Sequence, residues 1–242
     1  MQIITIAIQK GGTGKTTTAA ALSQAAALCG KKTLALDLDP QGNFTFALGA
    51  RPLKGTTSFD LIAGNGAEPQ TLADNLDVIP AAWELATLKT EPGSARRLQK
   101  AIKPLTKLYD FIFIDTPTIA GELQYNALQA STGLIIPLLG DIYNLQSLYQ
   151  MTDTAKRFQE KSNPDLNILG FIFTQIDTRS TIARQMQEKL TVLANKNNVP
   201  YLGSVRKGIA IQEAAALQKN LFEYAPKSNP ATDYLQIFER LI

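Results

Sequence analysis

Continuous runs of apolar residues recur along the chain and predict buried β-strands. The runs do not alternate with polar residues, which is typical of strands in a parallel sheet that helices cover on both faces. The predicted strands are Ile3–Ile8, Thr33–Leu38, Leu76–Ala81, Phe111–Asp115, Gly133–Leu138 and Ile168–Thr174.

Helical patterns fill the segments between these runs. The predicted helices are Lys15–Leu28, Ala95–Lys107, Glu122–Gln129, Leu145–Lys161, Thr181–Asn195, Ala210–Gln218 and Ala231–Leu241. This alternation predicts an α/β fold, a three-layer α/β/α sandwich with a mostly parallel, doubly wound sheet and right-handed crossovers. The stretch Gly49–Glu68 is predicted to be loop-rich. We find no repeat or interdomain linker, so we expect residues 1–242 to form a single domain.

The composition excludes several kinds of site. The 242 residues contain no histidine and one cysteine, Cys29, so histidine bases, zinc–histidine sites, internal disulfides and cysteine-ligated clusters are ruled out. We expect a cytoplasmic protein, because no apolar run approaches the ~20 residues that span a bilayer and no secretory signal is recognisable. The net charge of +3 is mildly basic, which leaves ordinary surface charge and nucleic-acid binding both open.

A glycine-rich loop joins the first predicted strand to the first predicted helix, in the segment IAIQKGGTGKTTT. Backbone N–H groups of such a loop converge on phosphate oxygens, and the N-terminus of the following helix favours negative charge. Glycines permit the close approach of backbone to phosphate that a Cβ atom would obstruct. We therefore expect a polyphosphate site formed by Lys10, Gly11, Gly12, Thr13, Gly14, Lys15, Thr16 and Thr17.

Three side chains of the loop have predictable tasks. Lys15 can reach the β- and γ-phosphates, the Thr16 hydroxyl can ligate Mg²⁺, and Thr17 can bond near the α-phosphate.

The usual phosphate-loop pattern G-x-x-x-x-G-K-[ST] is not met, because Gln9 stands at its first position. A second lysine, Lys10, precedes the glycines instead.

The sequence K-G-G-x-G-K-T-T, with its second lysine, resembles the ParA/MinD family of deviant Walker-type ATPases, and within it the small ParA- and Soj-like DNA-partition ATPases. The resemblance implies a P-loop NTPase that hydrolyses ATP with Mg²⁺ at a weak intrinsic rate. It also implies a homodimer with ATP, in which Lys10 of each monomer reaches the partner's nucleotide. Such a cation would act in phosphoryl transfer as an arginine finger does, so Lys10 and Lys15 are both expected to be catalytic.

Carboxylates follow two of the predicted strands. In LALDLDPQGN, Asp39 lies at a strand's carboxyl end, where ligands of α/β folds bind. The segment resembles the family's switch I, which implies that Asp39 positions the attacking water and lies near the metal. For Asp37, local capping or a salt bridge and a role in tuning the site both stay open. Asp115 ends the strand FIFID and is expected to accept from Mg²⁺-bound water and from Thr16.

The resemblance continues over nearly the whole chain. GFIFTQIDTRST resembles a later family segment and implies that Thr174 contributes to the nucleotide site. Relatives often carry P-R-N-x-R where this chain reads VRKGIAI, and that loop contributes to their adenine pocket. Arg206 stands at the proline position, so we expect Arg206 at the nucleotide as well, in a loop that departs from the pattern.

The motifs do not reveal the cargo of the ATPase, and two function classes stay open. In DNA partition, an ATP-bound dimer coats nonspecific double-stranded DNA of the nucleoid, and a ParB-like centromere-binding protein stimulates hydrolysis. A MinD-like membrane-positioning ATPase, or one that positions another cargo, is the alternative. Because the segment YLQIFERLI lacks a basic amphipathic face, we expect no membrane partner. The candidate DNA contacts are Arg179, Arg184, Lys189, Lys207 and Lys219, for which solvated surface charge is the other interpretation.

Overall fold

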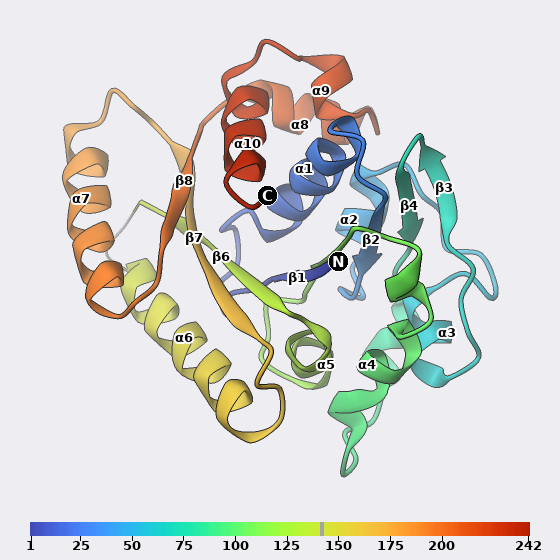
Figure 1. Ribbon diagram of the computed structural model, residues 1–242. Helices are drawn as coiled ribbons and strands as arrows, with labels where there is room; N and C mark the ends of the chain where they lie inside the picture. Colours follow the sequence, from blue (N-terminus) through green and yellow to red (C-terminus); the bar gives the residue numbers. More distant parts are fainter. Residues whose placement is uncertain (141–142) are drawn as a thin grey trace.

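The computed structural model, which describes residues 1–140 and 143–242, is built around one eight-stranded sheet with helices on both faces (Figure 1). The strands lie in the order β3-β4-β2-β5-β1-β6-β7-β8, and every neighbouring pair is parallel except β3 and β4. Their bounds are β1 Gln2–Ile6, β2 Thr33–Asp37, β3 Gln70–Ala73, β4 Leu76–Ile79, β5 Phe111–Asp115, β6 Gly133–Leu139, β7 Asn167–Ile176 and β8 Tyr201–Arg206. The predicted α/β fold with a mostly parallel sheet is confirmed.

The helices divide between the two faces of the sheet. The α-helices are α1 Lys15–Leu28, α2 Asn43–Ala47, α3 Ser58–Ala63, α4 Arg97–Ile102, α5 Glu122–Ala130, α6 Tyr143–Lys161, α7 Thr181–Lys196, α8 Ile209–Ala216, α9 Leu221–Tyr224 and α10 Asn229–Glu239. The 3-10 helices are η1 Trp83–Thr87, η2 Ser94–Arg96 and η3 Leu105–Lys107. Helices α1, α2, α8, α9 and α10 pack on one face, and α3 to α7 pack on the other.

Side-chain alternation along the strands fills both cores. On β5, Phe111 and Phe113 join the core that contains α1 and α10, whereas Ile112 and Ile114 join the core that contains α3, α4 and α5. All four side chains are buried. This two-sided burial explains why the strands are continuous apolar runs in the sequence.

Several predicted elements differ from those in the structure. The helix predicted over Ala95–Lys107 is wrong as a single element, because the segment consists of η2, α4 and η3. Pro104, which lacks an N–H group, separates α4 from η3. The loop-rich stretch Gly49–Glu68 contains helix α3, which begins at a capping box between Thr57 and Asp60. The edge strands β3 and β8 were not predicted.

The carboxyl ends of the parallel strands meet at one edge of the sheet. The order of strands places β5 and β6 on either side of β1, with β2 beyond β5 and β7 beyond β6. The loops that leave these strands are therefore neighbours, although they are far apart in sequence. Within the described part of the chain, no helix combines the length and apolarity that a membrane crossing requires.

Candidate functional site

The glycine-rich loop turns from β1 into α1 at the carboxyl edge of the sheet. Gly12 and Gly14 adopt φ angles of 73° and 82°, in the left-handed region that favours glycine. The Thr18 N–H donates to the Gly14 carbonyl at 2.8 Å, which begins the hydrogen bonding of the helix. The first turn of α1 therefore points its free N–H groups toward the loop, as an anion site requires.

Lys15 lies in the loop with its ammonium group largely withdrawn from water. The residue is 7% exposed, and its Nζ donates to the Lys10 carbonyl at 3.1 Å. Burial lowers the pKa of Lys15, while the charges of Asp115 and Asp39 act in the opposite direction. A buried ammonium with spare donors can bind an anion strongly.

Asp115 and Thr16 form a pair suited to a divalent cation. The Thr16 hydroxyl donates to Asp115 Oδ2 at 2.7 Å, whereas the buried Oδ1 has no hydrogen-bond partner among the described residues. Burial, followed by repulsion from Asp37, raises the pKa of Asp115 well above its ordinary value. A cation beside Oδ1 would satisfy this oxygen and favour the ionised carboxylate, so these two residues fit Mg²⁺ or a water bound to it.

The protein side chains alone do not make a complete metal site. In the described part of the chain, no three histidine, cysteine, aspartate or glutamate side chains are grouped so that they could hold a metal ion. Mg²⁺ commonly takes one or two protein ligands, with phosphate oxygens and water supplying the rest. The donor set is therefore the kind that receives magnesium together with a polyphosphate.

Asp37 and Asp39 have different surroundings. Asp37 is buried, and its carboxylate accepts from Asp39 N at 3.0 Å, from Thr45 N at 2.8 Å and from Thr45 Oγ1 at 2.7 Å. Burial raises the pKa of Asp37 to about 6. These contacts favour local hydrogen bonding as the role of Asp37, which fixes the turn between β2 and α2. Asp39 is half-buried and lines a cavity beside the loop.

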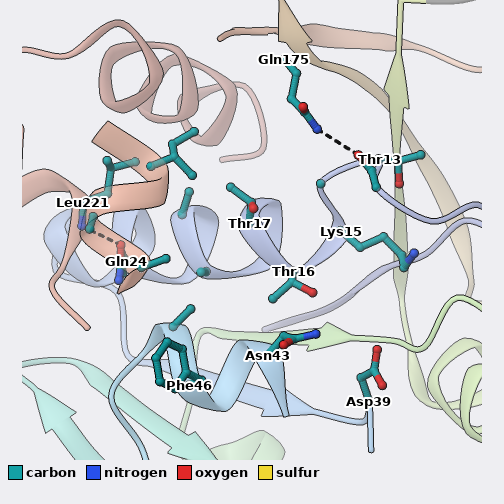
Figure 2. A pocket seen from close by; sticks show the side chains of 18 of the residues that line it. Thr13, Lys15, Thr16, Thr17, Gln24, Asp39, Asn43, Phe46, Gln175 and Leu221 are labelled. Atoms are coloured by element: carbon teal, nitrogen blue, oxygen red, sulfur yellow. Dashed lines mark hydrogen bonds between the residues drawn. The ribbon is translucent and has the colours of Figure 1, made fainter. Parts of the chain in front are cut away.

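Two cavities open on either side of the loop. The first, of about 500 Å³, lies between α1, α2 and α8, and Figure 2 shows Asp39, Asn43 and Phe46 lining it together with Thr16 and Thr17. The second, of about 440 Å³, lies between the segments that follow β7 and β8 and the start of α10. Both are lined by Gly14, Thr17, Gln175 and Ile211, so they adjoin at the loop.

Thr174 and its neighbour Gln175 contact the loop from the end of β7. The Thr174 hydroxyl donates to the Thr13 carbonyl at 2.8 Å. Gln175 Nε2 donates to the Gly12 carbonyl at 2.9 Å (Figure 2). Thr174 is buried, so its hydroxyl supports the loop from behind. The sequence reasoning missed Gln175, and no local motif distinguishes it.

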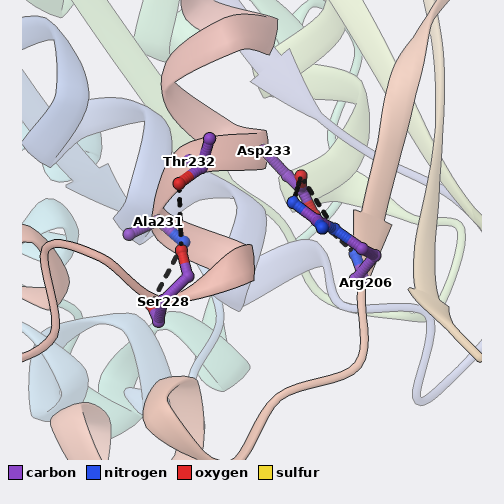
Figure 3. Close-up of polar contacts among 5 residues, drawn as sticks. All are labelled: Arg206, Ser228, Ala231, Thr232 and Asp233. Atoms are coloured by element: carbon purple, nitrogen blue, oxygen red, sulfur yellow. Dashed lines mark hydrogen bonds and ion pairs between the residues drawn. The ribbon is translucent and has the colours of Figure 1, made fainter.

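Arg206 forms an ion pair with Asp233 of helix α10. Its guanidinium bonds to both carboxylate oxygens of Asp233, at 2.6 Å from Nη2 and at 2.9 and 3.1 Å from Nε, and its N–H also donates to Asp233 (Figure 3). This pairing raises the pKa of Arg206. Arg206 lines the second cavity, with much of its charge compensated by Asp233. Its predicted contact with nucleotide stays a prediction.

The candidate DNA contacts do not form one cluster. Arg184 and Lys189 are exposed on α7, and Lys207 is held beside the end of β7 because its N–H donates to the Ile176 carbonyl at 2.9 Å. Arg179 bonds to Asp177 at 3.0 Å and lines the second cavity with Lys207. Lys219 lines the first cavity instead. The structure thus separates Lys219 from the group near β7 and α7.

Proteins of known function are similar to this chain over its full length. The profile of an AAA domain matches residues 1–168. The sporulation initiation inhibitor protein Soj of Bacillus subtilis is 35% identical over 245 residues, which cover 98% of this chain and 96% of Soj. The chromosome partitioning protein ParA of Caulobacter vibrioides is 32% identical over 253 residues, which cover 100% of this chain and 94% of that protein.

Solved structures are similar to the described fold. The septum site-determining protein MinD of Pyrococcus horikoshii, complexed with Mg-ADP, has a TM-score of 0.82 at 28% identity, covering 99% of this chain and 95% of MinD. Cobyrinic acid a,c-diamide synthase of Mycobacterium smegmatis, with a bound ATP analog and magnesium, has a TM-score of 0.84 at 28% identity, covering 100% and 94%. These two proteins have different functions, so the shared fold does not decide between them.

The ion pair of Arg206 and Asp233 generates a stability prediction. Asp233→Ala should lower the free energy of unfolding by about 2 kcal/mol, because it removes a nearly buried acceptor of several charge-assisted hydrogen bonds. Arg206→Ala should cost at least as much, about 2 kcal/mol, because it leaves the nearly buried Asp233 carboxylate with only the backbone N–H of residue 206. Urea denaturation of both variants measures these changes.

A surface pair provides the control for this prediction. Arg157 and Asp153 pair at 2.8 Å on α6 with both side chains more than half exposed, so Arg157→Ala should change stability by less than about 1 kcal/mol. Equal losses for Asp233→Ala and Arg157→Ala would contradict the structural importance of the Arg206 pair.

Proposed function

We propose that this chain, which belongs to the ParA/MinD family of Walker-type ATPases, is a Mg²⁺-dependent ATPase that dimerises with ATP and partitions DNA. The observation that carries the proposal is the loop between β1 and α1, with its two lysines and the Thr16–Asp115 pair beside it. It acts in the cytoplasm on the nucleoid, as a single domain of residues 1–242. Its intrinsic hydrolysis is weak.

ATP binds with its phosphates in the loop. The N–H groups of Gly11 to Thr17 and the Lys15 ammonium hold the phosphates, and Thr16 and Asp115 hold Mg²⁺. The bound ligands named for the similar MinD and synthase structures, Mg-ADP and an ATP analog with magnesium, support this assignment. The base occupies the second cavity, whose lining includes Thr174 and Arg206.

Hydrolysis depends on a second copy of the chain. Asp39 lines the first cavity and orients the attacking water near the metal. Lys10 lies at the outer end of the loop, where Gly11 and Gly12 are exposed, so the partner's nucleotide can approach it. A lysine supplied in trans stabilises charge on the transferring phosphoryl group, which makes hydrolysis conditional on dimerisation.

The ATP-bound dimer binds nonspecific double-stranded DNA. Arg184 and Lys189 on α7, with Lys207 and Arg179 near the end of β7, supply phosphate contacts, and Lys219 adds a charge near the first cavity. A ParB-like centromere-binding protein stimulates hydrolysis and release. The role named for the similar ParA protein, chromosome partitioning, supports this choice.

A MinD-like membrane function is the alternative, but helix α10 opposes it. Tyr234, Ile237 and Phe238 are buried in the core that contains α1, so the apolar face of α10 is occupied within the chain. A membrane-binding helix must present that face to lipid. Positioning of a cargo other than DNA by the same switch is a further alternative.

Lys15→Ala should remove ATP binding, because it deletes the buried ammonium that faces the phosphates. Isothermal titration calorimetry with Mg-ATP measures the loss. Lys32→Ala changes an exposed lysine outside the loop and should bind ATP as the parent does. Parental affinity in the Lys15 variant would refute the assignment of the loop as the phosphate site.

Asp39→Ala should trap an ATP-bound dimer, because the water is no longer positioned while binding contacts remain. Sedimentation velocity with ATP should show a persistent dimer, and phosphate release should be lost. Asp74→Ala, at an exposed carboxylate between β3 and β4, is the control. Hydrolysis at the parental rate by the Asp39 variant would rule out the water-positioning role.

Lys10→Ala should bind ATP but fail to hydrolyse it, because each site lacks the partner's lysine. Mixing this variant with Asp39→Ala tests the trans arrangement directly. In a mixed dimer, the Lys10→Ala chain keeps its own Asp39 and receives Lys10 from its partner, so one site is complete and activity returns. Two inactive variants that stay inactive together, under conditions where they form mixed dimers, would show that Lys10 acts within its own chain.

Co-sedimentation with DNA and with anionic liposomes, each with ATP or ADP across a salt series, separates partition from membrane positioning. We expect ATP-dependent DNA binding that weakens with salt, and a slope smaller by about one for each phosphate contact removed by Arg184→Glu or Lys189→Glu. Lys100→Glu and Lys103→Glu, on exposed positions of the α4 region, are matched controls. ATP-dependent liposome binding without DNA binding would favour the membrane alternative.

A further inference from the structure

We infer that Gln175 is a positioning residue that holds the phosphate loop in its anion-binding form. The inference rests on the proposed function, in which this loop binds nucleotide phosphates. Two observations support it: the backbone conformation of Gln175, and the hydrogen bonds that side chains of β7 donate to carbonyl groups of the loop.

Gln175 adopts a conformation that is unusual for a residue with a side chain. Its φ angle is 57°, in the left-handed region, where a Cβ atom crowds the backbone. At this point three residue steps along β7, from Phe173 to Ile176, oppose the two steps from Ser204 to Arg206 on β8. The extra residue is a bulge, a feature that redirects side chains next to functional sites.

The bulge lets two consecutive side chains reach the same loop. In a regular strand Thr174 and Gln175 would point to opposite faces of the sheet. Here Thr174 Oγ1 donates to the Thr13 carbonyl and Gln175 Nε2 donates to the Gly12 carbonyl. The residues that flank this pair agree with the bulge. Phe173 and Ile176 are three positions apart and would point to opposite faces of a regular strand, but here they lie in the same core.

Holding these carbonyls fixes the direction of the amide groups that bind anions. In a planar trans peptide the C=O and the following N–H point in opposite directions. With the carbonyls of Gly12 and Thr13 bonded to β7, the N–H groups of Thr13 and Gly14 are turned away from β7. Successive N–H groups presented in this way form an anion-binding nest.

Of the two bonded carbonyls, Gln175 holds that of Gly12, whose backbone is less restricted than that of Thr13. Gly12 has no Cβ atom, so its ψ angle, which sets the direction of its carbonyl, is less restricted than that of Thr13. Rotation would turn the Gly12 carbonyl toward the phosphates and repel them. Because the Thr174 hydroxyl holds only the next peptide, the Gln175 amide is the contact that selects the binding orientation at Gly12.

Gln175→Asn tests the inference. Asparagine tolerates the left-handed region and keeps an amide, but it is one carbon shorter and should not reach the Gly12 carbonyl. Calorimetry should show weaker binding of Mg-ADP and of Mg-pyrophosphate by the same factor, roughly two- to tenfold, as expected for one hydrogen bond. Thermal melts verify that the variant is folded.

Gln218→Asn is the matched control, because Gln218 is also left-handed, with a φ of 54°, and lines neither cavity. It should leave both affinities unchanged. Weaker ADP binding with unchanged pyrophosphate binding would assign Gln175 to the base or ribose and overturn the inference, as would parental affinity for both ligands. A parent protein that binds neither ligand would instead refute the proposed nucleotide function together with this inference.

Discussion

The rest of the site depends on the burial of charged groups at the carboxyl edge of the sheet. Lys15 and Asp115 are both buried. Burial lowers the pKa of Lys15 and raises the pKa of Asp115, which favours the neutral form of each. Buried charges are unfavourable unless they are paired and hydrogen-bonded. A phosphate chain with its metal would supply the missing partners, so the free energy that these groups cost the empty fold becomes affinity for that ligand.

The order of the strands brings the supporting groups to these charges. Asp115 comes from β5, the turn that carries Asp39 comes from β2, and Thr174 with Gln175 comes from β7. Each provides a different kind of support. Asp37 fixes the Asp39 turn through three hydrogen bonds, and the end of β7 holds loop carbonyls. The site is therefore rigid where phosphate must be oriented.

The rim of the second cavity is held by a contact between β8 and α10. Here both the N–H and the guanidinium of Arg206 bond to Asp233, so β8 and α10 are joined at the rim of the second cavity. The first cavity is bordered by α2, where Phe46 is 55% exposed and Thr45 bonds to the Asp37 carboxylate.

The sequence by itself determined the elements whose signals are local. Helix α1 and strand β5 have the predicted bounds, because a glycine loop opens the helix and an apolar run ended by Asp115 makes the strand. Edge strands β3 and β8 carry weaker patterns, since they are half-exposed or contain glycine. The motifs also related Thr16 to Asp115, and the structure confirms that hydrogen bond. Other meetings of remote groups were decided by the tertiary structure alone. Gln175 meets Gly12, and Arg206 meets Asp233, through hydrogen bonds between segments that no local periodicity relates.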